Sequence, residues 1–242
     1  MGKKCEKING DLTIILAYMN GDLRYTCGGK LDLCMDKPVF KRKIYDEIYE
    51  WKENRSDKYA LLIKGARRVG KSTIAEEFAK KEFKSYILID FAHTSKAIID
   101  LFDDTYDLDF FFLQLQQLMG IRLYEKESVI IFDEVQLFPK ARQAIKYLVA
   151  DGRYKYIETG SLLSIKKNTK DILIPSEEHK ISMFPMDFEE FLWAIGDEVS
   201  AETIRHLIKN KKPAGNAMHR NLMRIFRLYM LVGGMPQAIE TY

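Results

Sequence analysis

Residues 65–72 read Gly-Ala-Arg-Arg-Val-Gly-Lys-Ser, a complete G-x-x-x-x-G-K-[ST] pattern. Its glycines let the backbone turn tightly, so that successive N–H groups point inward and can hold phosphate oxygens. Lys71 would then reach the β- and γ-phosphates, and the Ser72 hydroxyl would bind Mg²⁺. The pattern therefore predicts a nucleoside triphosphate site with Mg²⁺. Its contacts are expected from one continuous run: Gly65, Ala66, Arg67, Arg68, Val69, Gly70, Lys71, Ser72 and Thr73.

Two adjacent carboxylates, Asp133 and Glu134, follow the apolar run at 129–132. We expect this run to be a buried strand beside the strand that precedes the loop, bringing Asp133 to the Mg²⁺ shell. Glu134, one residue further, would polarise a water for in-line attack on the γ-phosphate. Adjacent Asp and Glu therefore favour hydrolysis over simple carriage of the nucleotide.

A third polar group follows the expected strand at 154–157 and includes Thr159 and Ser161. Either side chain could sense the γ-phosphate or hold the attacking water. The alternative is a turn, in which Gly160 supplies backbone freedom and Ser161 caps the next segment. Spacing alone leaves both interpretations open.

An arginine that completes the site has no recognisable position, and one could act from a neighbouring copy in a homo-oligomer. The candidates are Arg142, Arg153, Arg224 and Arg227.

The elements that must hold these groups can be read from the surrounding pattern. A short apolar run at 59–64 predicts the strand before the loop, and apolar residues at helical spacing in 72–80 predict the helix after it. Further strands are expected at 85–91, 128–132, 154–157 and 180–184, and further helices at 41–52, 96–104, 107–122 and 139–151. This alternation predicts an α/β fold: a doubly wound parallel sheet of about five strands with helices on both faces.

We expect three parts along the chain. Residues 1–37 form an N-terminal extension with a possible hairpin around Asn20-Gly21. Residues 38–196 carry the loop and the carboxylates and form the P-loop domain. Residues 197–242 form a helical appendage, with helices expected at 200–210 and 216–231.

Composition restricts the partners and the compartment. The chain has 242 residues and a net charge of +3, which gives little support to a nucleic-acid partner. Solvated faces explain clusters such as Lys41-Arg42-Lys43 and the lysines at 209, 211 and 212 more often than phosphate contacts do. No apolar run approaches the 18 residues of a membrane span, and three cysteines fit a reducing compartment. We therefore expect a soluble, cytoplasmic protein.

Two competing classes of phosphate-loop protein fit poorly. A GTPase would carry D-x-x-G and N-K-x-D, but residues 133–136 lack the glycine and residues 168–171 place lysine one position late. A small-molecule kinase would need an arginine-rich lid, and Arg67 and Arg68 lie inside the loop instead. The base is therefore expected to be adenine.

Taken together, these motifs resemble prokaryotic AAA-type (additional-strand) ATPases of largely unassigned role. The match extends from about residue 38 to the C-terminus and rests on six segments: 40–45, 65–73, 132–136, 159–161, 184–191 and 233–238. The resemblance implies ATP rather than GTP, Mg²⁺, and a sensor role for residues 159–161. Relatives usually continue past the Gly-Gly-x-Pro segment into a further C-terminal domain, which we expect this chain to lack because it stops at Tyr242.

The resulting hypothesis is an ATPase of low intrinsic activity that couples its nucleotide state to an unknown protein partner. A nucleotide-dependent switch with negligible turnover is the first alternative. A DNA-associated ATPase, whose binding would depend on salt, is the second.

Overall fold

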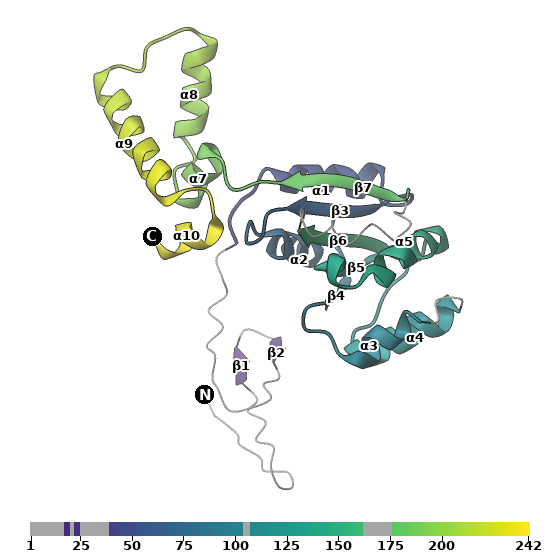
Figure 1. Cartoon of the computed structure of the whole chain (residues 1–242). Helices are drawn as coiled ribbons and strands as arrows, with labels where there is room; N and C mark the ends of the chain where they lie inside the picture. The colour runs from purple at the N-terminus through teal and green to yellow at the C-terminus, as the bar shows by residue number, and fades with distance from the viewer. Residues whose placement is uncertain (1–16, 20–21, 25–38, 104–106, 162–175) are drawn as a thin grey trace. The chain divides into compact units, whose positions relative to one another are not determined.

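The structure, a computed structural model, describes residues 17–19, 22–24, 39–103, 107–161 and 176–242 (Figure 1). The chain divides into two compact units, Met1–Pro38 and Val39–Tyr242. In the first unit, β1 (Ala17–Met19) pairs antiparallel with β2 (Asp22–Arg24). The Asn20-Gly21 dipeptide of the predicted hairpin falls between these strands and lies outside the described residues.

The second unit is built on one five-stranded sheet. Its strands are β3 (Ala60–Gly65), β4 (Ser85–Asp90), β5 (Ser128–Asp133), β6 (Lys155–Ser161) and β7 (Glu178–Met183). They are all parallel and lie in the order β4-β5-β6-β3-β7. The predicted α/β class with a parallel sheet of about five strands is confirmed.

Helices cover both faces of this sheet. They are α1 (Ile44–Asn54), α2 (Lys71–Glu82), α3 (Lys96–Leu101), α4 (Leu108–Met119) and α5 (Pro139–Asp151). Successive side chains of a strand point to opposite faces, so β3 contributes to two separate cores. Leu61 and Ile63 pack with α1 and α2, whereas Ala60 and Leu62 pack with α3, α4 and α5.

The strand order corrects one expectation. β5 does not lie beside β3, because β6 is hydrogen-bonded between them. Asp133 therefore approaches the loop across one intervening strand.

The second correction concerns residues 158–161, which form the last part of β6 rather than a turn. Their backbone pairs with β3 as far as Gly65 opposite Ser161. The sequence prediction ended this strand at Ile157 because polar side chains follow the apolar run. Glu158 and Thr159 are nevertheless fully buried within the strand.

The C-terminal region is helical. It contains α7 (Phe188–Ala194), α8 (Ser200–Lys209), α9 (Asn216–Val232) and α10 (Pro236–Thr241). These helices share a third apolar cluster, which includes Phe191, Ile225 and Ile239. None of the helices in the described part of the chain is long and apolar enough to cross a membrane. The predicted division at residue 196 stays a prediction.

Candidate functional site

The phosphate-binding motif joins β3 to α2. Gly65 is the last residue of β3, Lys71 is the first of α2, and Gly70 between them has the left-handed φ of 97° that the turn requires. The Lys71 side chain is buried, and its Nζ donates to the carbonyl oxygens of Ala66 (2.8 Å) and Gly65 (3.3 Å). Burial lowers the pKa of Lys71, while the Glu134 and Asp133 carboxylates oppose this. The ammonium group is thus held inside the loop.

Three of the predicted residues converge beside the loop. The Ser72 hydroxyl donates to Asp133 Oδ1 at 2.7 Å, and the Thr159 hydroxyl donates to the same oxygen. Asp133 and Thr159 are both buried, and they belong to the neighbouring strands β5 and β6. The structure therefore gathers the predicted Mg²⁺ ligands and the predicted sensor threonine around one carboxylate.

Glu134 is placed by its backbone as well as by its side chain. It follows β5 with a left-handed φ of 53°, and its N–H donates to the Thr159 hydroxyl at 3.3 Å. Its carboxylate accepts a hydrogen bond from Gln136 Nε2. Gln136 lies in the short 3₁₀ helix η1 (Val135–Leu137), and its Oε1 accepts the Ser161 N–H at 3.2 Å. Gln136 thus connects Glu134 to the end of β6.

Gln136 belongs to the motif at residues 132–136, but the sequence did not predict a role for it in the site. Its position two residues after Glu134 was the one feature of the sequence that could have indicated this role. Ser161 is buried and lies opposite Gly65 in the sheet. Its backbone N–H, rather than its hydroxyl, makes the contact with Gln136.

These groups fit the ligands that the motifs predict. A hydroxyl and a carboxylate within hydrogen-bonding distance form the oxygen donor set that Mg²⁺ prefers. Among the described residues, no group of three or more His, Cys, Asp or Glu gathers as a metal cluster. The absence of such a cluster among these residues is compatible with Mg²⁺, because this ion needs few ligands from the protein. It usually keeps several waters and binds through one or two carboxylates and the phosphates of a substrate.

Arg42 was expected on a solvated face, and this was wrong. Its side chain is 5% exposed, and Nη1 donates to the loop carbonyl of Val69 at 2.8 Å. Nη2 donates to the carbonyl of Phe184 at 2.7 Å, just after β7, and Nε lies 3.2 Å from Glu190 Oε1 on α7. One guanidinium therefore connects the loop, the end of β7 and α7.

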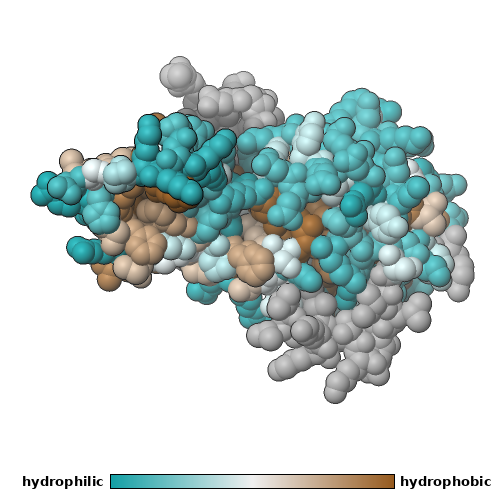
Figure 2. Space-filling view, turned by 90° about the horizontal axis from the view of Figure 1, so that it is seen from above, coloured by the Kyte–Doolittle hydropathy of each residue, from teal (hydrophilic) through white to brown (hydrophobic). Residues whose placement is uncertain are grey.

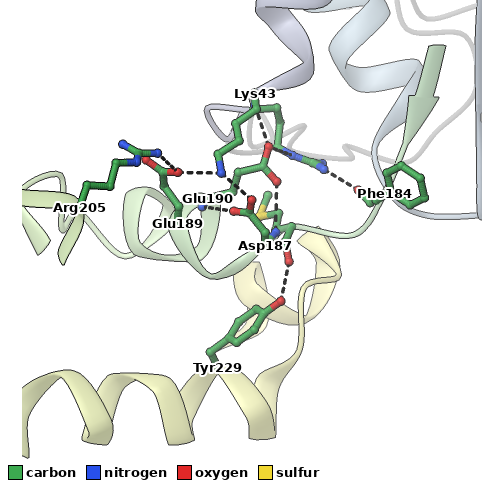
Figure 3. A network of polar contacts seen from close by, with 9 residues as sticks. Lys43, Phe184, Asp187, Glu189, Glu190, Arg205 and Tyr229 are labelled. Atoms are coloured by element: carbon green, nitrogen blue, oxygen red, sulfur yellow. Dashed lines mark hydrogen bonds and ion pairs between the residues drawn. The ribbon is translucent and has the colours of Figure 1, made fainter. Parts of the chain in front are cut away.

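The residues around this arginine strengthen the connection (Figure 3). The Lys43 N–H donates to Glu190 Oε1 at 2.7 Å, and its Nζ contacts Glu189 at 2.7 Å and Asp187 at 2.5 Å. Asp187 and Glu190 also form the capping box that begins α7. Glu189 in turn pairs with Arg205 of α8. The start of α7 is thus fixed by charges from both sides.

A short strap at 183–186 lies between the loop strand and the C-terminal helices. A side chain at Gly65 would overlap the backbone oxygen of Met183, and one at Gly234 would overlap that of Met186. The Met186 N–H donates to the Gly234 carbonyl at 2.7 Å, and its carbonyl accepts from the Tyr229 hydroxyl at 2.9 Å. Both glycines allow close backbone approach, a reason for glycine that the motif pattern does not reveal.

The four arginine candidates differ in their surroundings. Arg142 is buried and donates to both oxygens of Glu178, at 2.6 and 2.8 Å, so it cannot reach a neighbouring copy as placed. Arg153 contacts Asp151 at 2.8 Å and Asp109 at 2.5 Å, and it precedes β6 at the edge of the sheet opposite the loop. Arg224 and Arg227 are exposed on α9.

A buried carboxylate near Arg142 is less well satisfied. Neither oxygen of Glu158 has a hydrogen-bond partner among the residues that the structure describes. Burial and the neighbouring Glu178 carboxylate raise the pKa of Glu158 well above its ordinary range.

Comparison with known proteins places this geometry in context. A family model described as an AAA domain matches residues 57–192, more than half of the chain. An uncharacterized protein of Methanocaldococcus jannaschii is 22% identical over 227 residues, which cover 87% of this chain and 46% of that protein. The chain thus spans about half the length of the curated relative that it matches.

Proposed function

This chain belongs to the family of AAA domains, and on that premise we propose that it binds ATP with Mg²⁺ and hydrolyses the nucleotide slowly. The observation that carries the proposal is the convergence of Ser72 and Thr159 on Asp133 beside the loop. Ser72 and Asp133 are the proposed Mg²⁺ ligands, and when bound the ion would neutralise charge on the phosphates. The loop amides, with Lys71, would hold the phosphate oxygens.

Glu134 is the proposed base. It would hold the attacking water and accept its proton, while Thr159 or Ser161 would sense the γ-phosphate. The contact between Gln136 and Glu134 supports an orienting role for Gln136. We expect slow turnover by the isolated chain, because an arginine supplied by a neighbour is worth about 10³–10⁵ in rate.

The proposed coupling to a partner runs through Arg42. Its hydrogen bond to the Val69 carbonyl lies inside the phosphate loop, and its ion pair with Glu190 lies at the start of α7. A nucleotide that moves the loop backbone would therefore change a contact on which α7 depends. The C-terminal helices would carry that change to a protein partner.

One observation favours the alternative of a switch with negligible turnover. The Glu134 carboxylate already accepts a hydrogen bond from Gln136, so a water must compete for it. In that case the chain would bind ATP and change its contacts without splitting the nucleotide.

The experiment that separates the two is Glu134→Gln in the full chain, with Glu125→Gln on the exposed surface as the matched control. Loss of a positioned general base lowers turnover by about 10²–10⁴-fold. We expect that loss for Glu134→Gln, with ATP binding retained, and no loss for the control. Equal and negligible turnover in the wild type and the Glu134→Gln variant, with ATP still bound, would support the switch instead.

A further inference from the structure

The charge of this chain is distributed unevenly. Residues 203–239 contain seven Lys and Arg and no Asp or Glu, leaving 31 Lys and Arg against 35 Asp and Glu elsewhere. The net charge of +3 therefore combines a segment of +7 with a remainder of −4. We call residues 203–239 the basic segment. It comprises most of α8, all of α9 and the start of α10.

The positive charges of the basic segment are largely unneutralised. Arg205 pairs with Glu189. The other six are exposed, and none forms an ion pair with a carboxylate of the described residues: Lys209, Lys211, Lys212, Arg220, Arg224 and Arg227. The described partners of Arg220 and Arg224 are neutral, namely the Asn216 carbonyl and the Asn221 side chain.

Three of these charges form a stripe along α9. Arg220, Arg224 and Arg227 recur at helical spacing, so they share one face over about 10 Å, two turns of helix. The opposite face carries Ile225 and Tyr229, which pack in the apolar cluster around α7. In Figure 2 apolar residues gather over the helical part of the surface and hydrophilic residues border them. Because α9 is anchored by its apolar face, the stripe is held in a fixed position.

We propose that the basic segment binds the phosphate backbone of a nucleic-acid duplex, with Arg220, Arg224 and Arg227 as the central contacts. Unpaired arginines at fixed positions on a folded helix are suited to a regular array of phosphates. The whole-chain charge hides this surface because the excess of acids elsewhere nearly cancels it.

Two other anionic partners fit less well. Single strands are usually held by aromatic side chains that stack on the bases. The exposed aromatic residue of α9, Phe226, lies off the arginine stripe and packs against Phe188. A membrane surface is usually bound by a continuous apolar face of a basic helix, whereas Ile225 and Tyr229 of α9 pack in the cluster around α7. Met230 and Leu231 of α9 are exposed, so the test includes a membrane surface.

The proposed duplex binding does not depend on ATP hydrolysis, although it names a partner class that the proposed coupling could serve. Binding is therefore measured without nucleotide on the full chain, so that its failure is distinguishable from failure of the proposed ATPase. The probe is a labelled 20-base-pair DNA duplex, followed by fluorescence anisotropy between about 50 and 200 mM salt, the range in which phosphate contacts weaken most visibly.

The test variant carries Arg220→Gln, Arg224→Gln and Arg227→Gln together. Each phosphate contact contributes about −0.9 to the slope of log affinity against log salt, so the triple variant should flatten the slope by about 2–3. Affinity at low salt should fall more than tenfold. The matched control removes three exposed lysines of the sheet region, by Lys58→Gln, Lys96→Gln and Lys146→Gln, and should leave the slope unchanged. Thermal unfolding checks that both triple variants fold.

Four results would overturn the proposal. The first is no duplex binding by the folded wild-type chain at low salt. The second is an equal loss in the two triple variants, which would show an effect of net charge alone. The third is tighter binding to a single-stranded oligonucleotide than to the duplex. The fourth is tighter binding to vesicles containing phosphatidylserine than to the duplex.

Discussion

The phosphate loop and the arginine stripe of α9 both concentrate charge, but they hold it in opposite ways. Around the loop, Lys71, Asp133 and Arg42 are buried, and each is fixed by nearby polar atoms. On α9, the stripe is exposed and meets neutral partners at most. Buried charges must be paired because leaving them unpaired is costly, whereas exposed charges are solvated and weakly coupled.

This difference predicts how each region responds to mutation. Substitutions near the loop should have large, specific effects, because the lost partner leaves another buried group unsatisfied. Substitutions on the stripe should have small effects on stability and additive effects on phosphate binding.

The largest expected effect is from Arg42→Ala, paired with Lys43→Ala as its exposed neighbour. Removing Arg42 leaves Glu190 buried without its guanidinium, and breaking a buried pair costs about 3–5 kcal/mol of unfolding free energy. Lys43 is exposed, so its ion pairs should be worth about 1 kcal/mol or less. Urea unfolding of both variants measures the difference. If both variants lost the same unfolding free energy, burial would not explain a difference between the Arg42 and Lys43 ion pairs.

A medium effect, of opposite sign, is expected from Glu158→Gln. Because the pKa of Glu158 is raised in the folded chain, the folded carboxyl keeps a proton that the unfolded chain has lost. Wild-type stability should therefore fall as pH rises above the ordinary value of 4.5. The variant has no carboxyl to ionise, so it should escape this loss and gain about 1 kcal/mol or more relative to the wild type at pH 8, since each pKa unit is worth about 1.4 kcal/mol.

Thermal unfolding at pH 4 and pH 8 tests this prediction for Glu158. The gain should be small at pH 4, where both states hold the proton. A gain of the same size at both pH values would show that ionisation of this carboxyl is not its cause.

The smallest effect on stability is expected from Arg224→Gln alone. Exposed substitutions usually change unfolding free energy by less than about 0.5 kcal/mol, since few contacts are lost. Its effect on the salt slope of duplex binding should be about 0.9, one third of that in the triple variant. Thermal unfolding and anisotropy on the same sample separate the two quantities. A loss of several kcal/mol would show that Arg224 has a structural role.

Sequence patterns located most elements of the sheet domain for a simple physical reason. β3 and β5 are buried on both faces, so each appears as a continuous apolar run. The order of these strands in the sheet could not be predicted from the sequence. It depends on β6 pairing between β3 and β5, and no local pattern indicates which strands pair. β6 was ended too early because Glu158 and Thr159 are polar yet buried.

The candidate site divides in the same way. Lys71, Ser72, Asp133 and Glu134 could be predicted because their spacing is itself the motif. Arg42 could not, since one buried arginine among three consecutive basic residues has no local signature. Its partners lie 27 and 142 residues away in the chain.

The two glycines that flank the 183–186 strap have a consequence for how this chain can be cut and recombined. Gly65 and Gly234 come from distant parts of the sequence, yet each presses bare backbone against the same few residues. A graft that exchanges the C-terminal helices for those of a relative must therefore reproduce the strap as well as the helices. The segment to exchange as one piece must also include Arg42, which contacts both the loop and α7, so it begins before α1 and ends with α10.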